Sequence, residues 1–236
     1  MGGDIRMRET PPDLMTGTAA QLEAGDGDRP SDSNLLLEGM ACRYKITHDG
    51  TRQIFSFQLP GDIFDAQSFI LETMDHSVAT LTPCKVAVIP HKTMEEITEA
   101  YPRIARAIWK NTLVDAAVFR EWMLSIGRRS AYQRIAHLMC EVYTRLDVVG
   151  LAEDNSVHWP ITQAELGDAL GLSEVHVNRT LMELRAAKLI TLNNSRLTVE
   201  DCDGLKEAGQ FDPDYLHLKR PASAHTECAA AIRESL

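Results

Sequence analysis

Hydrophobic residues recur in short alternating runs over the first part of the chain, between residues 34 and 89. Turn-forming residues, among them Gly50 and Gly61, separate these runs. The runs lie at 35–37, 41–47, 53–59, 78–81 and 86–89. Because alternation of this length is typical of half-buried strands, the pattern predicts a β-roll, that is, a small sandwich or jelly roll.

Beyond Pro90 the hydrophobic period becomes helical, with a helix expected around 93–100 and a long one over 102–127. The long helix carries a mostly apolar seam at alternating spacings of four and three. The seam consists of Ala105, Trp109, Thr112, Ala116, Phe119, Met123 and Ile126. Such a seam favours a two-fold contact between copies of the chain, and packing on the β-roll is the alternative. Val118 and Trp122 lie on a neighbouring face, so one helix can do both.

Residues 162–190 have the pattern of two short helices joined by a tight turn. Thr162 and Glu165 form a capping box that predicts a helix start, and Gly171 suits the left-handed conformation that ends a helix. Ser173 is a good N-cap for a second helix that runs to about Lys188. This pattern indicates a helix-turn-helix, with an ordinary helical hairpin in an all-α core as the alternative.

The second helix separates an apolar side from an outward side that suits DNA. Arginine can donate bidentately to guanine, asparagine can pair with adenine, and valine can meet a thymine methyl group. The residues predicted to face base edges are Val175, Asn178 and Arg179. Those predicted to lie nearer phosphates are Ser173, His176 and Thr180. Glu174 can accept a hydrogen bond from a cytosine amino group.

A wing follows the two helices. Alternating residues at 189–192 and 196–199 flank Asn193, Asn194 and Ser195, which can supply the positive φ of a tight hairpin. The sequence therefore predicts a winged helix-turn-helix. A short helix is expected over 201–208, with Phe211 and Tyr215 packing against the winged domain.

The helical period breaks at 127–130, where we expect a hinge between domains. Ser130 can cap a further helix that runs through Arg145. Arg128 and Arg129 are expected either to approach DNA phosphates or to form an exposed basic hinge, and the pattern favours neither alternative.

Together these patterns predict an α+β protein in five segments. Residues 1–33 are polar and are expected to form a loose N-terminal segment. The other segments are a β-roll effector-like domain over 34–101, a dimerisation helix over 102–127, a winged helix-turn-helix DNA-binding domain over 128–218 and a flexible tail over 219–236.

Charge and hydropathy narrow the class of protein. No apolar run approaches the ~18 residues of a membrane span, and the N-terminus lacks a hydrophobic signal region, so we expect a cytoplasmic protein without membrane contact. The formal net charge of -10 argues against non-specific coating of nucleic acid, but it permits site-specific binding to double-stranded DNA. A homodimer would double the few phosphate contacts and read a pseudo-palindromic site.

Candidate chemistry other than DNA binding is sparse. The five cysteines have no metal-type spacing, so we expect neither a metal nor another cofactor. A redox role for Cys42 or Cys84 stays open. No Ser-His-Asp order, carboxylate-pair motif or phosphate-binding glycine loop indicates an enzyme, so no catalytic residue is expected. The alternative function is a ligand or redox sensor whose winged domain serves as a protein-interaction module.

The order of β-roll, long helix and winged helix-turn-helix resembles the Crp–Fnr family of bacterial transcription regulators. The segment GLSEVHVNRTLMELR at 171–185 is similar to the branch whose reading helix carries VHVNRTL, and 35–62 resembles the family's strand-turn-strand core. The resemblance covers about 34–216. It implies a cyclic-nucleotide-binding-like jelly roll, a dimer helix at 102–127, a reading helix at 173–188, and RNA polymerase as a partner.

This chain differs from the family in the two segments with which family members bind the phosphate of a cyclic nucleotide. Those members use a Gly-Glu pair before a short helix and an Arg-Ser-Ala segment, whereas this chain has Phe-Asp-Ala at 64–66 and Asp-His-Ser-Val at 75–78. Asp65 and Asp75 would repel a phosphate, and His76 is a poor substitute for arginine. We therefore expect no binding of cyclic AMP or cyclic GMP. Family members also have further strands before Leu35, so the roll is expected to be incomplete or completed differently.

Overall fold

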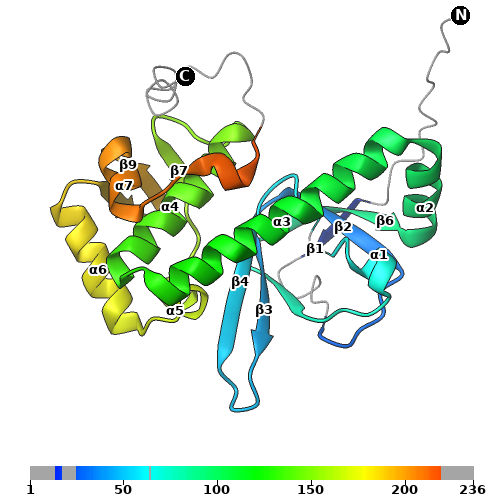
Figure 1. Ribbon diagram of the computed structural model, residues 1–236, viewed down its shortest axis with the longest axis horizontal. Coiled ribbons are helices and arrows are strands. Elements are labelled where there is room, and N and C mark those ends of the chain that lie inside the picture. The colour runs from blue at the N-terminus through cyan, green and yellow to red at the C-terminus, as the bar shows by residue number, and fades with distance from the viewer. Residues whose placement is uncertain (1–13, 18–24, 64, 219–236) are drawn as a thin grey trace, which may run out of the picture.

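Two three-stranded antiparallel sheets build the N-terminal part of the computed structural model, which describes residues 14–17, 25–63 and 65–218 (Figure 1). The first sheet has the strand order β1 (Leu14–Gly17), β6 (Cys84–Pro90), β2 (Asp32–Glu38). The second has the order β4 (Arg52–Gln58), β3 (Ala41–Ile46), β5 (Ser77–Thr80). Each of the predicted alternating runs forms a strand, which confirms the β-roll. The short helix α1 (Ser68–Leu71), which the hydrophobic pattern did not reveal, precedes β5, and α2 (His91–Ala100) follows β6.

Strand β1 corrects the prediction of a loose segment over residues 1–33. Its residues pair antiparallel with β6, from Leu14 opposite Ala87 to Gly17 opposite Cys84. β2 also begins inside the predicted loose segment, at Asp32. A four-residue strand between polar flanks is too short to give a visible hydrophobic period, which explains the error. Residues 25–31 are described, and the backbone of Gly27 and Asp28 hydrogen-bonds to that of Met74. Residues 1–13 and 18–24 and the predicted tail at 219–236 lie outside the described residues.

The long helix α3 (Pro102–Arg128) runs from the β-roll to the winged domain (Figure 1). One face is buried and includes Val118 and Trp122, as the pattern predicted. The predicted seam lies mainly on the open side, where Trp109 is 66% exposed and Met123 is 74% exposed. Phe119 differs from these two, because it is only half-exposed and its ring lies 5.9 Å from that of Phe55 in the roll.

The winged domain begins after α3 and is mostly helical. Ser130 caps α4 through the predicted box, with its Oγ accepting from the backbone N–H of Gln133. Asn194 and Ser195 have positive φ at the tip of the wing, as predicted. The three-residue strand β7, which the pattern missed, extends the wing sheet beside β9. The elements are α4 (Ala131–Val148), β7 (Ser156–His158), α5 (Gln163–Leu170), α6 (Glu174–Ala186), β8 (Ile190–Asn193), β9 (Arg196–Val199), α7 (Cys202–Gly209) and the 3-10 turn η2 (Pro213–Leu216).

One hydrophobic core joins the roll to the winged domain. It contains Ile54 and Phe57 from β4, Trp122 from α3, and Met139 from α4, all buried. The same cluster continues into α5, α6 and the wing, where it includes Leu181. A separate, smaller core lies within the roll. Because the larger core is continuous, the roll and the winged domain are held in a defined relative position.

A buried carboxylate on α4 ties this core together through hydrogen bonds. Glu141 is 1% exposed, and its oxygens accept from the Trp122 indole at 3.1 and 3.2 Å and from the Tyr215 hydroxyl at 2.7 Å. Burial raises the pKa of Glu141, while Arg145 one turn later opposes that rise. Polar partners on α3, α4 and η2 thus converge on one side chain.

Arg145 extends the same network to the β-roll. Its guanidinium donates to the Asp62 carboxylate at 2.6 Å and to the Phe57 carbonyl at 3.1 Å, and it lies 3.8 Å from Glu141. Only 16% of the Arg145 side chain is exposed. The arginine therefore compensates two carboxylates that come from different domains.

Candidate nucleic-acid interface

The helix pair α5 and α6 starts from local capping interactions that the sequence predicted. Thr162 Oγ1 accepts from the Glu165 backbone N–H at 3.2 Å, and Glu165 Oε2 accepts from the Thr162 N–H at 2.7 Å. Gly171 follows α5 with a φ of 64°, which suits glycine. Ser173 Oγ then accepts from the His176 N–H and caps α6.

The backbone of the turn between the two helices approaches α5 closely at Gly167. A Cβ atom on Gly167 would lie 2.6 Å from the Leu172 carbonyl oxygen, so only glycine fits at this position. Val177, Leu181 and Leu184 of α6 are fully buried beneath this turn. Helix α6 is therefore packed on the core through one face, and its opposite face is exposed.

The free face of α6 presents six of the predicted DNA-binding residues. The exposed members are Ser173, Glu174, Val175, His176, Asn178 and Arg179. Val175 is 79% exposed, and the Arg179 side chain is 67% exposed. Arg179 forms only a weak ion pair, because its Nε lies 3.8 Å from Glu183 and both side chains are exposed. Asn178 Nδ2 donates to Gln163 Oε1 at 3.2 Å.

Thr180 is a correction to the predicted set. It is 3% exposed and lies on the buried side of α6, three residues after Val177 and next to Leu181. Its hydroxyl therefore cannot reach a phosphate. The polar character of threonine suggested an outward position, whereas its helical spacing assigns it to the core.

Arg129 is a second correction, because it does not form an exposed basic hinge. Its side chain is 7% exposed, and its guanidinium lies 2.6 Å from Glu121 and donates to the Gln210 carbonyl. This arginine holds the end of α3 and is not available to phosphates. Arg128, by contrast, is exposed.

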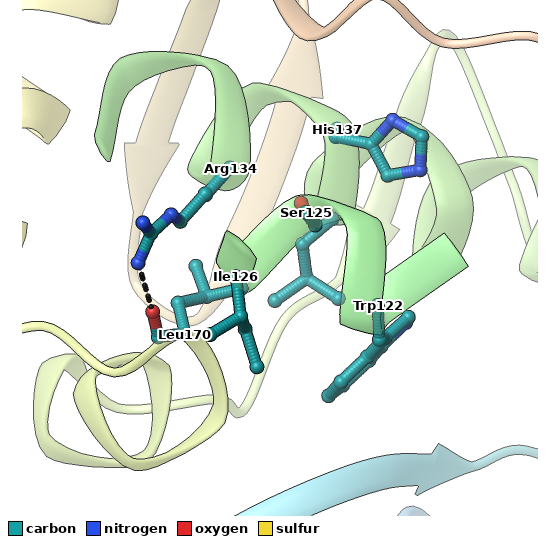
Figure 2. Close-up of a pocket in the computed structure, with 7 residues that line it drawn as sticks. Trp122, Ser125, Ile126, Arg134, His137 and Leu170 are labelled. Carbon is teal, nitrogen blue, oxygen red and sulfur yellow. Dashed lines mark hydrogen bonds between the residues drawn. The ribbon is translucent and has the colours of Figure 1, made fainter. Parts of the chain in front are cut away.

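Arg134 on α4 connects the end of α3 to the turn of the helix-turn-helix. Its Nε donates to the Arg129 carbonyl and its Nη1 to the Leu170 carbonyl, both at 2.9 Å. Figure 2 shows Arg134 reaching Leu170 beside a cavity of about 10 Å³, which Trp122 and Ser125 of α3 also line. The last carbonyl of α5 thereby obtains a partner that helix geometry alone does not supply.

The β-roll holds the same end of α5 from the other side. Arg52 Nε lies 2.7 Å from the Asp168 carboxylate, and Gln53 Nε2 donates to the Ala169 carbonyl at 3.2 Å. The sequence analysis missed these contacts, because the partners are more than a hundred residues apart and neither end has a local motif. The helix-turn-helix is thus held in place by contacts from both domains.

The charged side chains around the predicted phosphate-repelling segment of the roll already have partners within the protein. Asp65 is 1% exposed and accepts from the backbone and side-chain N–H groups of Asn34, both at 2.6 Å. Arg43, the buried arginine nearby, pairs with Asp115 at 3.0 Å. Burial raises the pKa of Asp65 and lowers the pKa of His76. Phe64, which also figured in the prediction, lies outside the described residues.

The described cysteines with free thiols do not have the character of redox sensors. Cys42 is fully buried, and burial raises the pKa of its thiol to about 12. Cys84 is 5% exposed, and its pKa is raised for the same reason. A thiol reacts as its thiolate, so both environments suppress reactivity.

The described residues contain neither a candidate metal site nor a candidate membrane span. No group of three or more histidine, cysteine, aspartate or glutamate side chains there could hold a metal ion. Across the same residues, no helix has the length and hydropathy needed to cross a membrane.

Comparisons with known proteins agree with this architecture in both halves of the chain. The Crp-like helix-turn-helix domain matches residues 133–208, and the cyclic nucleotide-binding domain matches residues 24–101. The first match contains α5, α6 and the wing, and the second contains the described roll from residue 25 through α2.

Relatives and solved structures extend the likeness over most of the chain. The transcriptional activator protein FnrL of Cereibacter sphaeroides is 28% identical over 200 residues, which cover 83% of this chain and 80% of FnrL. A probable transcriptional activator of Rhizobium leguminosarum bv. viciae is 28% identical over 192 residues, 79% of either chain. The structure of FixK2 from Bradyrhizobium japonicum matches with a TM-score of 0.71 and 24% identity, covering 78% of this chain and 90% of FixK2. The chain belongs to the Crp–Fnr family of DNA-binding transcription regulators.

Proposed function

We propose that two copies of this chain pair along α3 and place their α6 helices in successive major grooves of a pseudo-palindromic DNA site. The observation that carries the proposal is the free face of α6, where Asn178 and Arg179 are exposed above a rigidly packed core. In this arrangement Arg179 pairs with a guanine, Asn178 pairs with an adenine, and Val175 meets a thymine methyl group.

The flanking residues of α6 have complementary roles. Glu174 accepts from a cytosine amino group, while Ser173 and His176, at the start of the helix, lie beside phosphates. The exposed backbone N–H groups at a helix N-terminus support an anion there. Because relatives are named as transcriptional activators, the proposal extends to contact with RNA polymerase.

Replacing Arg179 with alanine is expected to relax specificity at one base pair of each half-site. Loss of a bidentate arginine–guanine pair costs about 1 to 3 kcal/mol, which is roughly 5- to 150-fold in affinity for the preferred sequence. Selection from random duplex DNA, followed by titration of single-base variants, measures this change. Arg103→Ala, at an exposed position in the first turn of α3, is the matched control.

Equal weakening on all sequences would make Arg179 a phosphate contact and would contradict the assigned role. The same selection decides between this proposal and a winged domain that binds protein. If the unmodified chain enriched no DNA motif, the protein-interaction alternative would stand.

The exposed seam of α3 supports the dimer. Trp109 and Met123 are large apolar side chains that solvent would otherwise cover. The double variant Trp109→Asp/Met123→Asp is therefore expected to sediment as a monomer at micromolar concentrations, where the unmodified chain sediments as a dimer. Ile46→Asp, at a 60% exposed position on β3, is the control and should leave the dimer intact. A dimer that survived the double variant would place the contact elsewhere.

We further propose that cyclic nucleotides do not control the protein. Support comes from the buried carboxylate of Asp65 and from Arg43, whose guanidinium already faces Asp115. Calorimetric titration with cyclic AMP and with cyclic GMP is expected to give no binding heat. Saturable binding of either nucleotide would contradict this part of the proposal.

A further inference from the structure

We propose that Gln163, on the first turn of α5, is a positioning residue that sets which edge of the Asn178 amide faces DNA. The inference rests on the proposed function, in which Asn178 reads a base. It concerns a residue outside the reading helix whose own amide does not pair with that base. The observation behind it is the hydrogen bond from Asn178 Nδ2 to Gln163 Oε1 at 3.2 Å.

The chemistry of an amide explains why one such contact matters. An asparagine amide carries an oxygen acceptor on one side and an NH2 group with two N–H donors on the other. The two sides are similar in shape, so the amide can turn over and exchange them. Pairing with adenine requires the oxygen to accept from N6 while one N–H donates to N7. When Gln163 accepts from the other N–H, the amide cannot turn over without losing that bond. The oxygen and the remaining N–H of Asn178 are then fixed as a donor–acceptor pair.

The backbone around Gln163 is held firmly enough to make this contact reproducible. Gln163 directly follows Thr162, whose capping box with Glu165 fixes the start of α5. Buried Leu166 anchors α5 from below. On the opposite side, buried Val177 immediately precedes Asn178 and seats α6 on the same core. Since both helices pack on the same core, the two amides are held within hydrogen-bonding distance of each other.

Both side chains are exposed, so substitution of Gln163 need not disturb the fold. Gln163→Met keeps a similar length and removes the acceptor. Gln163→Glu keeps an oxygen acceptor, and its negative charge is favourable at a helix N-terminus. These two variants form a matched pair that separates hydrogen bonding from bulk.

The test measures base preference with the full chain on a random duplex DNA library. For the unmodified chain, one position of the enriched half-site should prefer adenine, and Asn178→Ala should abolish that preference. Gln163→Met should lower the same preference by about 2- to 10-fold, as expected for one hydrogen bond, and leave the other positions unchanged. Gln163→Glu should retain most of the preference. In the Asn178→Ala background, Gln163→Met should change nothing further.

Four results would overturn the inference, and they are distinguishable. If Gln163→Met weakened binding equally at all positions, Gln163 would be a phosphate contact. If it left the adenine preference intact, or if its effect persisted without Asn178, the hydrogen bond would not guide recognition. If the unmodified chain enriched no motif, the proposed function itself would fail, and this inference with it.

Discussion

Replacing Arg145 with methionine is expected to lower the free energy of unfolding by about 3 kcal/mol or more. The arginine pairs with Asp62 from the roll and compensates Glu141, which is 1% exposed. Methionine fills a similar volume and leaves both carboxylates without their cation. The cost is large because a buried charge that loses its partner keeps its full desolvation penalty.

The loss of unfolding free energy in the Arg145→Met variant should become smaller as the pH falls. Burial already raises the pKa of Glu141, and removal of Arg145 raises it further. A carboxyl group whose pKa is higher in the folded than in the unfolded state destabilises the protein while it is ionised. The difference between the variant and the unmodified chain should therefore shrink as the pH falls from 7 toward the ordinary carboxyl range.

Urea unfolding followed by tryptophan fluorescence measures both effects, because Trp122 and Trp159 are buried. Arg106→Met, at an exposed position on α3, is the control. In addition, Glu141→Gln combined with Arg145→Met should cost less than the two separate changes added together. Equal midpoints for Arg145→Met and Arg106→Met would show that the network contributes little to stability.

Replacing Gly209 with alanine is expected to destabilise the winged domain by about 1 to 3 kcal/mol. A Cβ atom there would lie 2.6 Å from the backbone nitrogen of His137 and 2.8 Å from its Cα. These atoms belong to the main chain of α4, so relief requires α7 to move away from the helix that it covers. The His137 ring, which lies 3.1 Å from the Gly209 carbonyl, would lose that contact as well.

Gly127 provides a control with the opposite sign. An added Cβ atom at this position in α3 would meet nothing within 4 Å. Gly127→Ala should raise stability by roughly 0.5 to 1 kcal/mol, since alanine is the better helix former. Thermal unfolding of both variants at one protein concentration measures the contrast. If Gly209→Ala left the stability unchanged or raised it, α7 would be able to shift on α4 without cost.

Much of the fold could be predicted because its signals are local. The capping box at Thr162 and the left-handed Gly171 place the helix boundaries within a few residues of sequence. Thr180 shows how a local argument fails: side-chain polarity was given more weight than its spacing from Val177 and Leu181. Helical spacing alone would have assigned it to the core.

Contacts between distant residues could not be predicted from the sequence. Arg129, at the end of α3, looks like an exposed basic residue until the fold brings the Gln210 carbonyl to it and buries its side chain beside Glu121. Arg52 has no local feature that points to Asp168 on α5. Such partners are selected by tertiary packing, and a single sequence does not encode them as a pattern.

The continuous core also bears on how regulators of this architecture can be recombined. A boundary drawn in the chain at the end of α3 separates Trp122 from Glu141 and the Phe57 carbonyl from Arg145, which donates to it. In a chimaera that took its winged domain from another regulator, the new domain would therefore lack the residues that pack against this roll and α3. To be functional, the exchanged segment would have to carry matching residues from β4 and the last turns of α3. The smallest segment that can be exchanged is therefore larger than the DNA-binding domain.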